Sequence, residues 1–217
     1  MTPWIKICGL TRADAVAAAL AARIDAIGFV FTSSPRRLSP SAAAALAAPA
    51  RGRLACVAVA RRPSQPLIDE ILSVFKPDLL QLDMEDLPSL SLPSGCAVLP
   101  VLRSGHAEPD RLPARLLYEG AVSGAGARCD WQGARAVAAR TELVLAGGLN
   151  AAHIGEALRA VRPFGLDVSS GVEIEPGIKS PERMQEFVIA ARTAFATLKA
   201  GAQTAGEDSI MNEASPT

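Results

Sequence analysis

Eight short apolar runs, separated by longer stretches rich in alanine, are the feature that most constrains the fold of this chain. The runs are Trp4–Cys8, Ala26–Phe31, Leu54–Ala60, Leu79–Asp83, Ala97–Arg103, Arg115–Glu119, Glu142–Ala146 and Gly165–Ser169. Apolar strands that alternate with helices are typical of a parallel sheet covered by helices. Eight such units predict an α/β protein with a single, compact (β/α)₈ barrel, and 217 residues suffice for one.

The connections between the runs predict helices of uneven regularity. Asp14–Arg23 is alanine-rich, and Ser64–Phe75 carries apolar residues at helical spacing. Ser39 is an expected N-cap with Pro40 at the first helical position. By contrast, Glu85–Ser94 and Ser104–Pro113 are interrupted by proline, so we expect short turns or irregular loops there.

Two features fit the barrel less well. Pro100 lies inside the fifth run, although proline cannot donate a hydrogen bond within a central strand. The segment Gly201–Thr217 is small and polar without periodicity. We therefore expect a barrel domain over residues 1–200 and a polar C-terminal tail, beginning as a helix end, over residues 201–217.

Composition argues against several classes of function. With a formal charge of +0, the chain has no basic field that would suggest binding to nucleic acid or to an anionic membrane. The pairs Arg36-Arg37 and Arg61-Arg62 are interpreted as solvated surface. No apolar run reaches the roughly 18 residues of a membrane helix. The chain starts directly with a strand pattern, so we expect no signal peptide.

The cysteines and histidines predict neither a disulfide framework nor a metal site. Four cysteines lie far apart without CxxC spacing, and the chain has only two histidines. Reduced thiols in the cytoplasm are the simplest interpretation.

Cys8 ends the first apolar run and is followed at once by a glycine. In a (β/α)₈ barrel this position lies at the carboxyl ends of the strands, where active sites are built. Two interpretations of the segment remain open on its own evidence: a thiol that takes part in chemistry, or a small buried hydrophobe that closes the strand.

Glycine-rich loops follow the last two strands. Ala146-Gly147-Gly148 and Ser169-Ser170-Gly171 could present backbone N–H groups to an anion, and barrel phosphate sites often lie in these loops. The glycines could instead serve only tight turns. Gly124 and Gly126, after the sixth strand, are candidates for a third set of amides. A phosphate site, the Cys8 thiol and the Glu119 carboxylate together suggest acid–base chemistry on a phosphorylated small molecule.

A set of motifs in this order resembles the phosphoribosylanthranilate isomerase family, from Lys6 to about Lys179. The motifs are Lys6-Ile-Cys-Gly-Leu-Thr11, Gly28-Phe-Val-Phe31, Ser34-Pro-Arg36, Gln81-Leu82, Cys129-Asp-Trp131, Leu145-Ala-Gly-Gly-Leu-Asn150, Asp167-Val-Ser-Ser-Gly-Val-Glu173 and Pro176-Gly-Ile-Lys179. The resemblance implies a cofactor-free barrel that performs an Amadori rearrangement in tryptophan biosynthesis, converting N-(5-phosphoribosyl)anthranilate to the carboxyphenylamino-deoxyribulose phosphate.

The resemblance also implies roles for individual residues. Cys8 matches the general base, and Glu119 occupies the position of the general acid. Expected substrate contacts are Arg36, Gln81, Asp83 and Asp167, and the expected phosphate contacts are Gly124, Gly126, Ala146, Gly147, Gly148, Ser169, Ser170 and Gly171. No metal and no cofactor are expected. The expected partner is a small phosphorylated substrate, without nucleic acid or membrane, and the chain is a monomer or a homodimer.

The sequence departs from the family at several positions. Glu119 replaces an aspartate, and Asp83-Met84 replaces His-Gly, so that Asp83 would repel the anthranilate carboxylate unless it is turned away or protonated. Cys129 replaces a phenylalanine and is expected to pack, while Asp130 is an expected N-cap. These departures keep two alternatives open: a related isomerase acting on another phosphorylated aminosugar or ketose, and an inactive barrel that binds a phosphate ligand.

Overall fold

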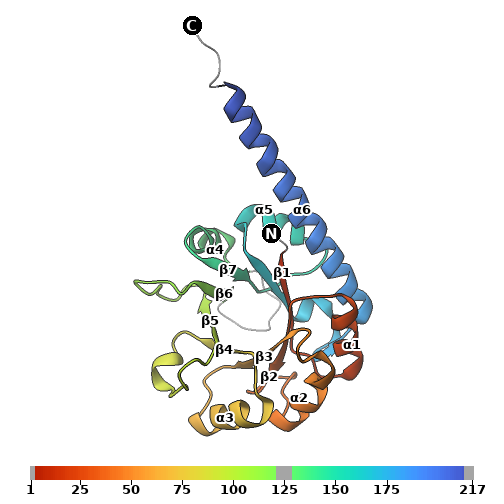
Figure 1. Cartoon of the computed structure of the whole chain (residues 1–217), viewed down its shortest axis with the longest axis vertical. Helices are drawn as coiled ribbons and strands as arrows, with labels where there is room; N and C mark the ends of the chain where they lie inside the picture. Colours follow the sequence, from red (N-terminus) through yellow and green to blue (C-terminus); the bar gives the residue numbers. More distant parts are fainter. Residues whose placement is uncertain (1–2, 121–128, 213–217) are drawn as a thin grey trace.

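The computed structural model describes residues 3–120 and 129–212, in which eight parallel strands close into a barrel surrounded by helices (Figure 1). The strands are β1 Trp4–Cys8, β2 Ala26–Val30, β3 Ala55–Ala60, β4 Leu79–Asp83, β5 Val98–Arg103, β6 Arg115–Glu119, β7 Glu142–Leu145 and β8 Gly165–Val168. Each strand pairs with the next, and β1 also pairs with β8 in parallel register. The predicted (β/α)₈ barrel is confirmed.

The helices follow the predicted pattern. They are α1 Ala13–Ala21, α2 Pro40–Ala47, α3 Gln65–Glu70, α4 Trp131–Ala138, α5 Ile154–Val161 and α6 Pro181–Asn212. Ser39 caps α2 by accepting a 3.2 Å hydrogen bond from the Ala42 N–H. Asp130 caps α4 by accepting a 2.9 Å bond from the Gln132 N–H. Both predicted N-caps are confirmed.

Short elements complete the connections. The 3₁₀ helices are η1 Ala48–Ala50, η3 Leu87–Ser89 and η4 Ser170–Val172, and α3 continues into a π-helical turn, η2 Ile71–Phe75. The segment after β4 holds only η3, and the loop after β5 has no helix in the described structure. Both irregular connections were expected. A small antiparallel hairpin, β9 Glu173–Glu175 and β10 Ile178–Lys179, follows β8.

Pro100 lies in β5 without breaking it. The carbonyls of Ala97 and Val101 accept hydrogen bonds from Leu80 in β4 and from Met84, the residue after β4. Because successive residues of a strand direct their backbone groups to opposite sides, those of Pro100 point to the β6 side. Pairing between β5 and β6 begins only at Val101. The missing N–H of Pro100 therefore interrupts no bond in the sheet.

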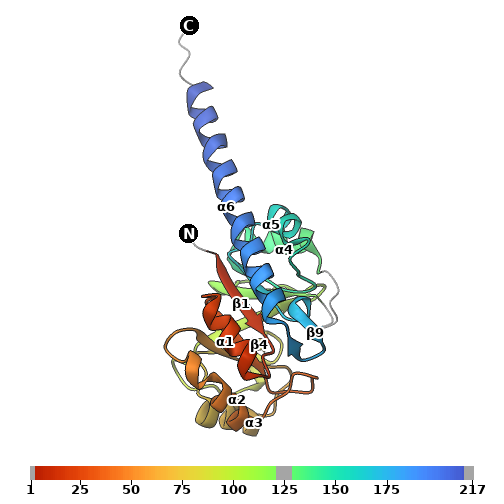
Figure 2. The same cartoon turned by 90° about the vertical axis from the view of Figure 1, so that its right-hand side faces the viewer.

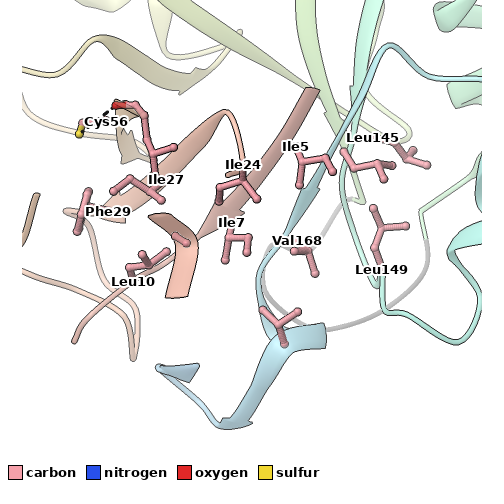
Figure 3. Close-up of a cluster of buried hydrophobic side chains, with 14 of the residues drawn as sticks. Ile5, Ile7, Leu10, Ile24, Ile27, Phe29, Cys56, Leu145, Leu149 and Val168 are labelled. Atoms are coloured by element: carbon pink, nitrogen blue, oxygen red, sulfur yellow. Dashed lines mark hydrogen bonds between the residues drawn. The ribbon is translucent and has the colours of Figure 1, made fainter. Parts of the chain in front are cut away.

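The strands bury both of their faces. Outward-facing residues such as Ile5, Ile7 and Val168 pack into the large core between strands and helices (Figure 3). A smaller cluster, made of Leu99, Val101, Leu117, Val144 and Ala146, fills the inside of the barrel. Because successive side chains on a strand alternate, burying Ile5 and Ile7 outward directs Trp4, Lys6 and Cys8 inward.

Helix α6 packs on α1 and α5, and its C-terminal end extends beyond the barrel (Figures 1 and 2). The helix runs through Asn212, so the segment expected as a polar tail begins as helix. The domain boundary at residue 200 stays a prediction. Among the described helices, none is both long and apolar enough to span a membrane.

Candidate active site

A cavity of about 630 Å³ opens at the carboxyl ends of the barrel strands. It is the place where barrel enzymes bind their substrates. Of the residues predicted from the sequence to form a site, those lining the cavity are Cys8, Arg36, Gln81, Asp83, Glu119, Ala146, Gly147, Gly148, Asp167, Ser169 and Ser170. Gly171 is not among the residues that line the cavity, and Gly124 and Gly126 fall outside the described residues.

Cys8 lies at the tip of β1, beside Gly28 of β2. A β-carbon at position 28 would lie 2.9 Å from the Cys8 sulfur and 3.1 Å from Cε of Lys6. Real β-carbons essentially never lie as close to another atom as the shorter of these two distances, 2.9 Å. Gly28 is therefore the residue that leaves room for the thiol and the lysine to lie side by side.

Lys6 lies two residues before Cys8 on the same inward face of β1, and its side chain is 0% exposed. Its ammonium donates a 2.8 Å hydrogen bond to Oδ1 of Asp167 on β8. A buried charge without a counter-ion would cost several kcal/mol, so this pair is what allows Lys6 to be buried.

These charges act on the thiol in opposite directions. Burial raises the pKa of Cys8 and Asp167 raises it further, whereas Lys6 and Lys179 lower it; the net effect is a raised pKa. Burial also raises the pKa of Asp167, against the opposing effect of Lys6. For Lys6, burial lowers the pKa, but Asp167 and Cys8 outweigh burial and raise it. Cys8 is therefore mostly a neutral thiol at rest, beside a protonated lysine.

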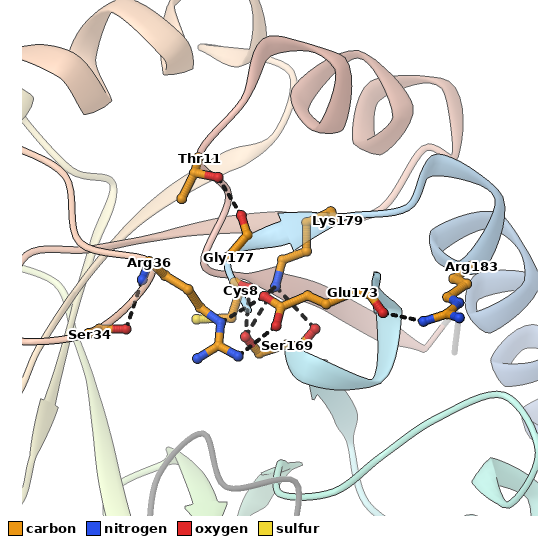
Figure 4. A network of polar contacts seen from close by, with 9 residues as sticks. All are labelled: Cys8, Thr11, Ser34, Arg36, Ser169, Glu173, Gly177, Lys179 and Arg183. Carbon is orange, nitrogen blue, oxygen red and sulfur yellow. Dashed lines mark hydrogen bonds and ion pairs between the residues drawn. The ribbon is translucent and has the colours of Figure 1, made fainter. Parts of the chain in front are cut away.

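A second polar cluster joins the loop after β2 to the hairpin after β8 (Figure 4). Glu173 accepts two 2.7 Å hydrogen bonds from Nε and Nη2 of Arg36, and a third 2.7 Å bond from Nζ of Lys179. Lys179 also donates to the carbonyl and hydroxyl of Ser169 at 3.1 and 3.2 Å. The Ser169 hydroxyl in turn donates a 3.0 Å bond to the Cys8 carbonyl. This network fixes the surroundings of the thiol.

The same contacts set the charges of the cluster. Burial would raise the pKa of Glu173, but hydrogen bonds from Arg36 and Lys179 outweigh it and lower the pKa. Hydrogen bonding to Glu173 raises the pKa of Arg36. Glu173 is thus an anion shared by two cations, which leaves the cluster with a net positive charge.

A third cluster lies across the cavity, at the ends of β4, β5 and β6. Arg103 donates to both carboxylate oxygens of Asp83, from Nε at 2.8 Å and from Nη2 at 2.7 Å. Its Nη1 reaches Oε2 of Glu119 at 3.2 Å. Arg61 places its Nε 3.2 Å from Oδ2 of Asp83. The carboxylate of Asp83 is therefore neutralised by two guanidinium groups.

The loops after β7 and β8 lie against each other. A β-carbon on Gly171 would lie 1.9 Å from the carbonyl oxygen of Leu149, so only glycine permits this approach. Gly147 and Gly148 have φ of 92° and 65°, a conformation that favours glycine. In residues 3–120 and 129–212, the amides of these two glycines donate no hydrogen bond. Such amides can bind an anion.

Ala146 differs from the neighbouring glycines. Its N–H donates a 2.8 Å bond to the Tyr118 carbonyl, so this amide is part of the sheet. Ala146 lines the cavity through its small side chain. His153 holds the loop from the other side, because its Nε2 donates a 2.8 Å bond to the Gly148 carbonyl.

The surroundings of Cys129 and of the two arginine pairs test what the sequence predicts for them. Cys129 is buried in the core, and burial raises its pKa to about 11, which confirms that it packs. The interpretation of the arginine pairs as solvated surface is wrong for Arg36, which is buried against Glu173. The Arg61 side chain is 39% exposed, and it lines the cavity beside Asp83.

Strand alternation indicates Lys6 as a neighbour of Cys8, because it lies two residues before the thiol, and the structure confirms this. Several other members of the site are not singled out from the sequence for their contacts: Arg61, Arg103, Glu173 and Lys179. For these, the contact depends on which strand tips become neighbours, and residue spacing does not contain that information.

Comparisons with known proteins point to one family. The model of the family described as N-(5'phosphoribosyl)anthranilate (PRA) isomerase matches residues 5–190. The chain is 38% identical over 209 residues to the N-(5'-phosphoribosyl)anthranilate isomerase of Mesorhizobium japonicum, covering 88% of this chain and 95% of that protein. It is 37% identical over 219 residues to that of Rhizobium etli, covering 92% and 99%. The solved phosphoribosyl anthranilate isomerase of Thermus thermophilus superposes with a TM-score of 0.74 at 27% identity, covering 90% and 99%.

Proposed function

The chain belongs to the N-(5′-phosphoribosyl)anthranilate isomerase family and catalyses its Amadori rearrangement in tryptophan biosynthesis; for this reaction we propose Cys8 as the general base and Glu119 as the general acid. The observation that supports these roles most directly is that the two side chains line one cavity, from β1 and from β6. A base and an acid on separate walls can act on two different atoms of one substrate.

In the first step, Glu119 donates its proton to the ribose ring oxygen, and the C1′–O bond opens to give an imine that is protonated on nitrogen. The side chain of Glu119 is 15% exposed, so it is largely screened from bulk water yet lines the cavity. A general acid in such a position contributes roughly 10²- to 10⁴-fold to the rate.

In the second step, the Cys8 thiolate takes the proton from C2′, and the electron pair left behind moves through C1′ to the iminium nitrogen. The resulting enolamine becomes the ketose when C1′ takes up a proton and the C2′ hydroxyl gives up its own. Lys6 and Lys179 favour the thiolate against the effect of burial. These two cations are the reason that a buried thiol can serve as a base here.

The substrate phosphate is proposed to bind the amides of Gly147, Gly148, Ser170 and Gly171. The positive charge of Lys179 lies close to the second loop, because its ammonium donates to Ser169. Gly124 and Gly126 remain proposed contacts. Arg36, Gln81 and Asp167 are proposed to contact the rest of the substrate, since all three line the cavity. The partner of this site is therefore a small phosphorylated molecule.

The anion at position 83 is compatible with a substrate that carries the anthranilate carboxylate. Arg103 and Arg61 both contact Asp83, so the expected repulsion is offset. Position 83 is one of the departures that left a different substrate open, and its surroundings give no support for such a substrate. Retention of the Cys8 and Glu119 groups in one cavity argues against an inactive barrel.

The proposed roles can be tested with N-(5′-phosphoribosyl)anthranilate, whose fluorescence is lost on turnover. Cys8→Ala and Glu119→Gln are each expected to lower kcat by about 10²- to 10⁴-fold. Cys56→Ala is the matched control, because Cys56 is a buried thiol of β3 that belongs to the core outside the cavity. Wild-type turnover in the Cys8→Ala protein would refute the role of the thiol.

The need for a free thiol at Cys8 supports the proposal that the protein works in the reducing cytoplasm. We keep a monomer or a homodimer as the proposed assembly.

A further inference from the structure

We propose that Arg103, fixed in place by Asp83, is a positioning residue that sets the orientation of the Glu119 carboxyl. The inference rests on the proposed role of Glu119 as the acid. It links the two departures from the family, at positions 83 and 119, through one side chain.

The geometry of Arg103 is determined by Asp83. The two side chains meet through paired bonds of 2.8 and 2.7 Å, an arrangement in which the planar guanidinium matches both carboxylate oxygens. Such a paired contact fixes the plane of the guanidinium as well as its position. The third nitrogen, Nη1, is then directed at Oε2 of Glu119, at 3.2 Å, and at the Gly120 carbonyl, at 3.3 Å.

The cluster is built on rigid elements. Asp83, Arg103 and Glu119 are the last residues of the neighbouring strands β4, β5 and β6, and Arg103 is the register partner of Glu119. The Arg103 side chain is only 6% exposed. Sites whose side chains are carried by strands and locked by buried contacts hold their geometry better than sites on loops.

Glu119 needs such a contact more than an aspartate would. Its side chain has one more rotatable bond, and that freedom must be restricted before the carboxyl points at a substrate atom. The contact with Arg103 supplies the restriction. Asp83 offsets part of the positive charge of Arg103 and Arg61, so the contact orients the acid with less positive charge beside it than unpaired arginines would bring.

A double-mutant cycle tests this role. Arg103→Met is expected to lower kcat for N-(5′-phosphoribosyl)anthranilate by about 10- to 100-fold, with KM changed less than about threefold, because misplacement of a catalytic group mainly affects the chemical step. Glu119→Asp is expected to lower kcat by a similar factor. In the double variant the two losses should not multiply, because the shorter acid loses the same contact. A full product of the two losses would overturn the inference.

Conservative replacements separate positioning from charge. Arg103→Lys keeps the positive charge but cannot pair with both oxygens of Asp83, so kcat is expected to stay low. Full activity in the lysine variant would contradict a role in orientation. If Arg103→Met does not fold, Asp83→Asn takes its place in the cycle with Glu119→Asp, since the amide keeps the size of the side chain.

Arg115→Met is the matched control. Arg115 forms an ion pair at 2.7 Å with Glu142, at the opposite end of β6 from Glu119. Its loss should leave kcat unchanged. A drop in kcat equal to that of Arg103→Met would show a general effect on β6 and refute the positioning role. Full turnover by Glu119→Gln would instead refute the acid assignment, so the two failures are distinguishable.

Discussion

Lys6 and Asp167 are register partners on β1 and β8, and their 2.8 Å ion pair lies at the seam where the barrel closes. The pair is buried directly beneath the candidate base, because Cys8 follows Lys6 on the same face of β1. The contact therefore has two consequences, one for the stability of the barrel and one for the chemistry of the thiol.

The stability consequence can be measured by chemical denaturation. Lys6→Met alone should lower the free energy of unfolding by about 3–5 kcal/mol, because it leaves Asp167 buried without its counter-ion. The double variant Lys6→Met/Asp167→Leu should recover a large part of that loss, since both charges are then removed. Losses that simply add in the double variant would show that the two residues do not stabilise each other.

The chemical consequence appears in the pH dependence of Cys8. Burial raises the pKa of this thiol, so the thiolate forms only at higher pH than for an ordinary cysteine, whose pKa is about 8.5. The rate of alkylation of Cys8 by iodoacetamide, followed by mass spectrometry of its peptide, should therefore rise with pH and have its midpoint above that value. The pH profile of kcat/KM should rise over the same range.

Lys6→Met provides the comparison for this titration. Removal of the ammonium removes an effect that lowers the pKa of Cys8, so the alkylation profile should move to still higher pH. Cys96, which is partly exposed and distant in sequence, serves as the internal reference thiol, and its profile should not move. A Cys8 profile shifted to lower pH would contradict the assigned effect of Lys6.

Gly28→Ala tests the space beside the thiol. The added methyl group would lie 2.9 Å from the Cys8 sulfur, so the sulfur must move. We expect kcat to fall roughly tenfold, since displacement of a reacting group is costly, and the free energy of unfolding to fall by about 1–3 kcal/mol. Gly155→Ala is the matched control, because a β-carbon at this position in α5 would come no closer than 3.5 Å to a neighbouring atom; it should leave turnover unchanged. Normal turnover in Gly28→Ala would show that the thiol does not need this space.

Gly171→Ala tests the proposed phosphate loops. A methyl group here would lie 1.9 Å from the Leu149 carbonyl oxygen and must push the loops after β7 and β8 apart. We expect KM to rise about tenfold or more and inhibition by inorganic phosphate to weaken in parallel, because both depend on amides held at fixed positions. An unchanged inhibition constant for phosphate would place the anion elsewhere.

The barrel could be predicted from the sequence because each strand is buried on both faces and therefore appears as a continuous apolar run. The predicted ends differ from the observed ends where the chain leaves the sheet. The sequence predicts Phe31, Ala146 and Ser169 as strand residues, but β2, β7 and β8 end one residue earlier. Phe31 and Ala146 are apolar and still donate a backbone hydrogen bond to the neighbouring strand, so apolar character does not mark the end of a strand.

The site could be predicted only in part. Residues at the carboxyl end of a strand, such as Cys8 and Glu119, are indicated by the barrel itself, and the cavity includes both. The contacts among side chains at the strand ends could not be predicted, because they depend on which strand tips become neighbours in space. The sequence therefore suggested repulsion at Asp83, whereas Arg103 and Arg61 surround that carboxylate.

The seam between β1 and β8 also has a consequence for the order in which the molecule becomes active. A ribosome makes β1 first, and Lys6 gains its counter-ion only when residue 167 has been made. Glu173 and Lys179, which complete the surroundings of Cys8, are made later still. A nascent chain that already contains the thiol and the first seven strands therefore still lacks the electrostatic environment of the base, and activity begins only after the chain has been made as far as Lys179.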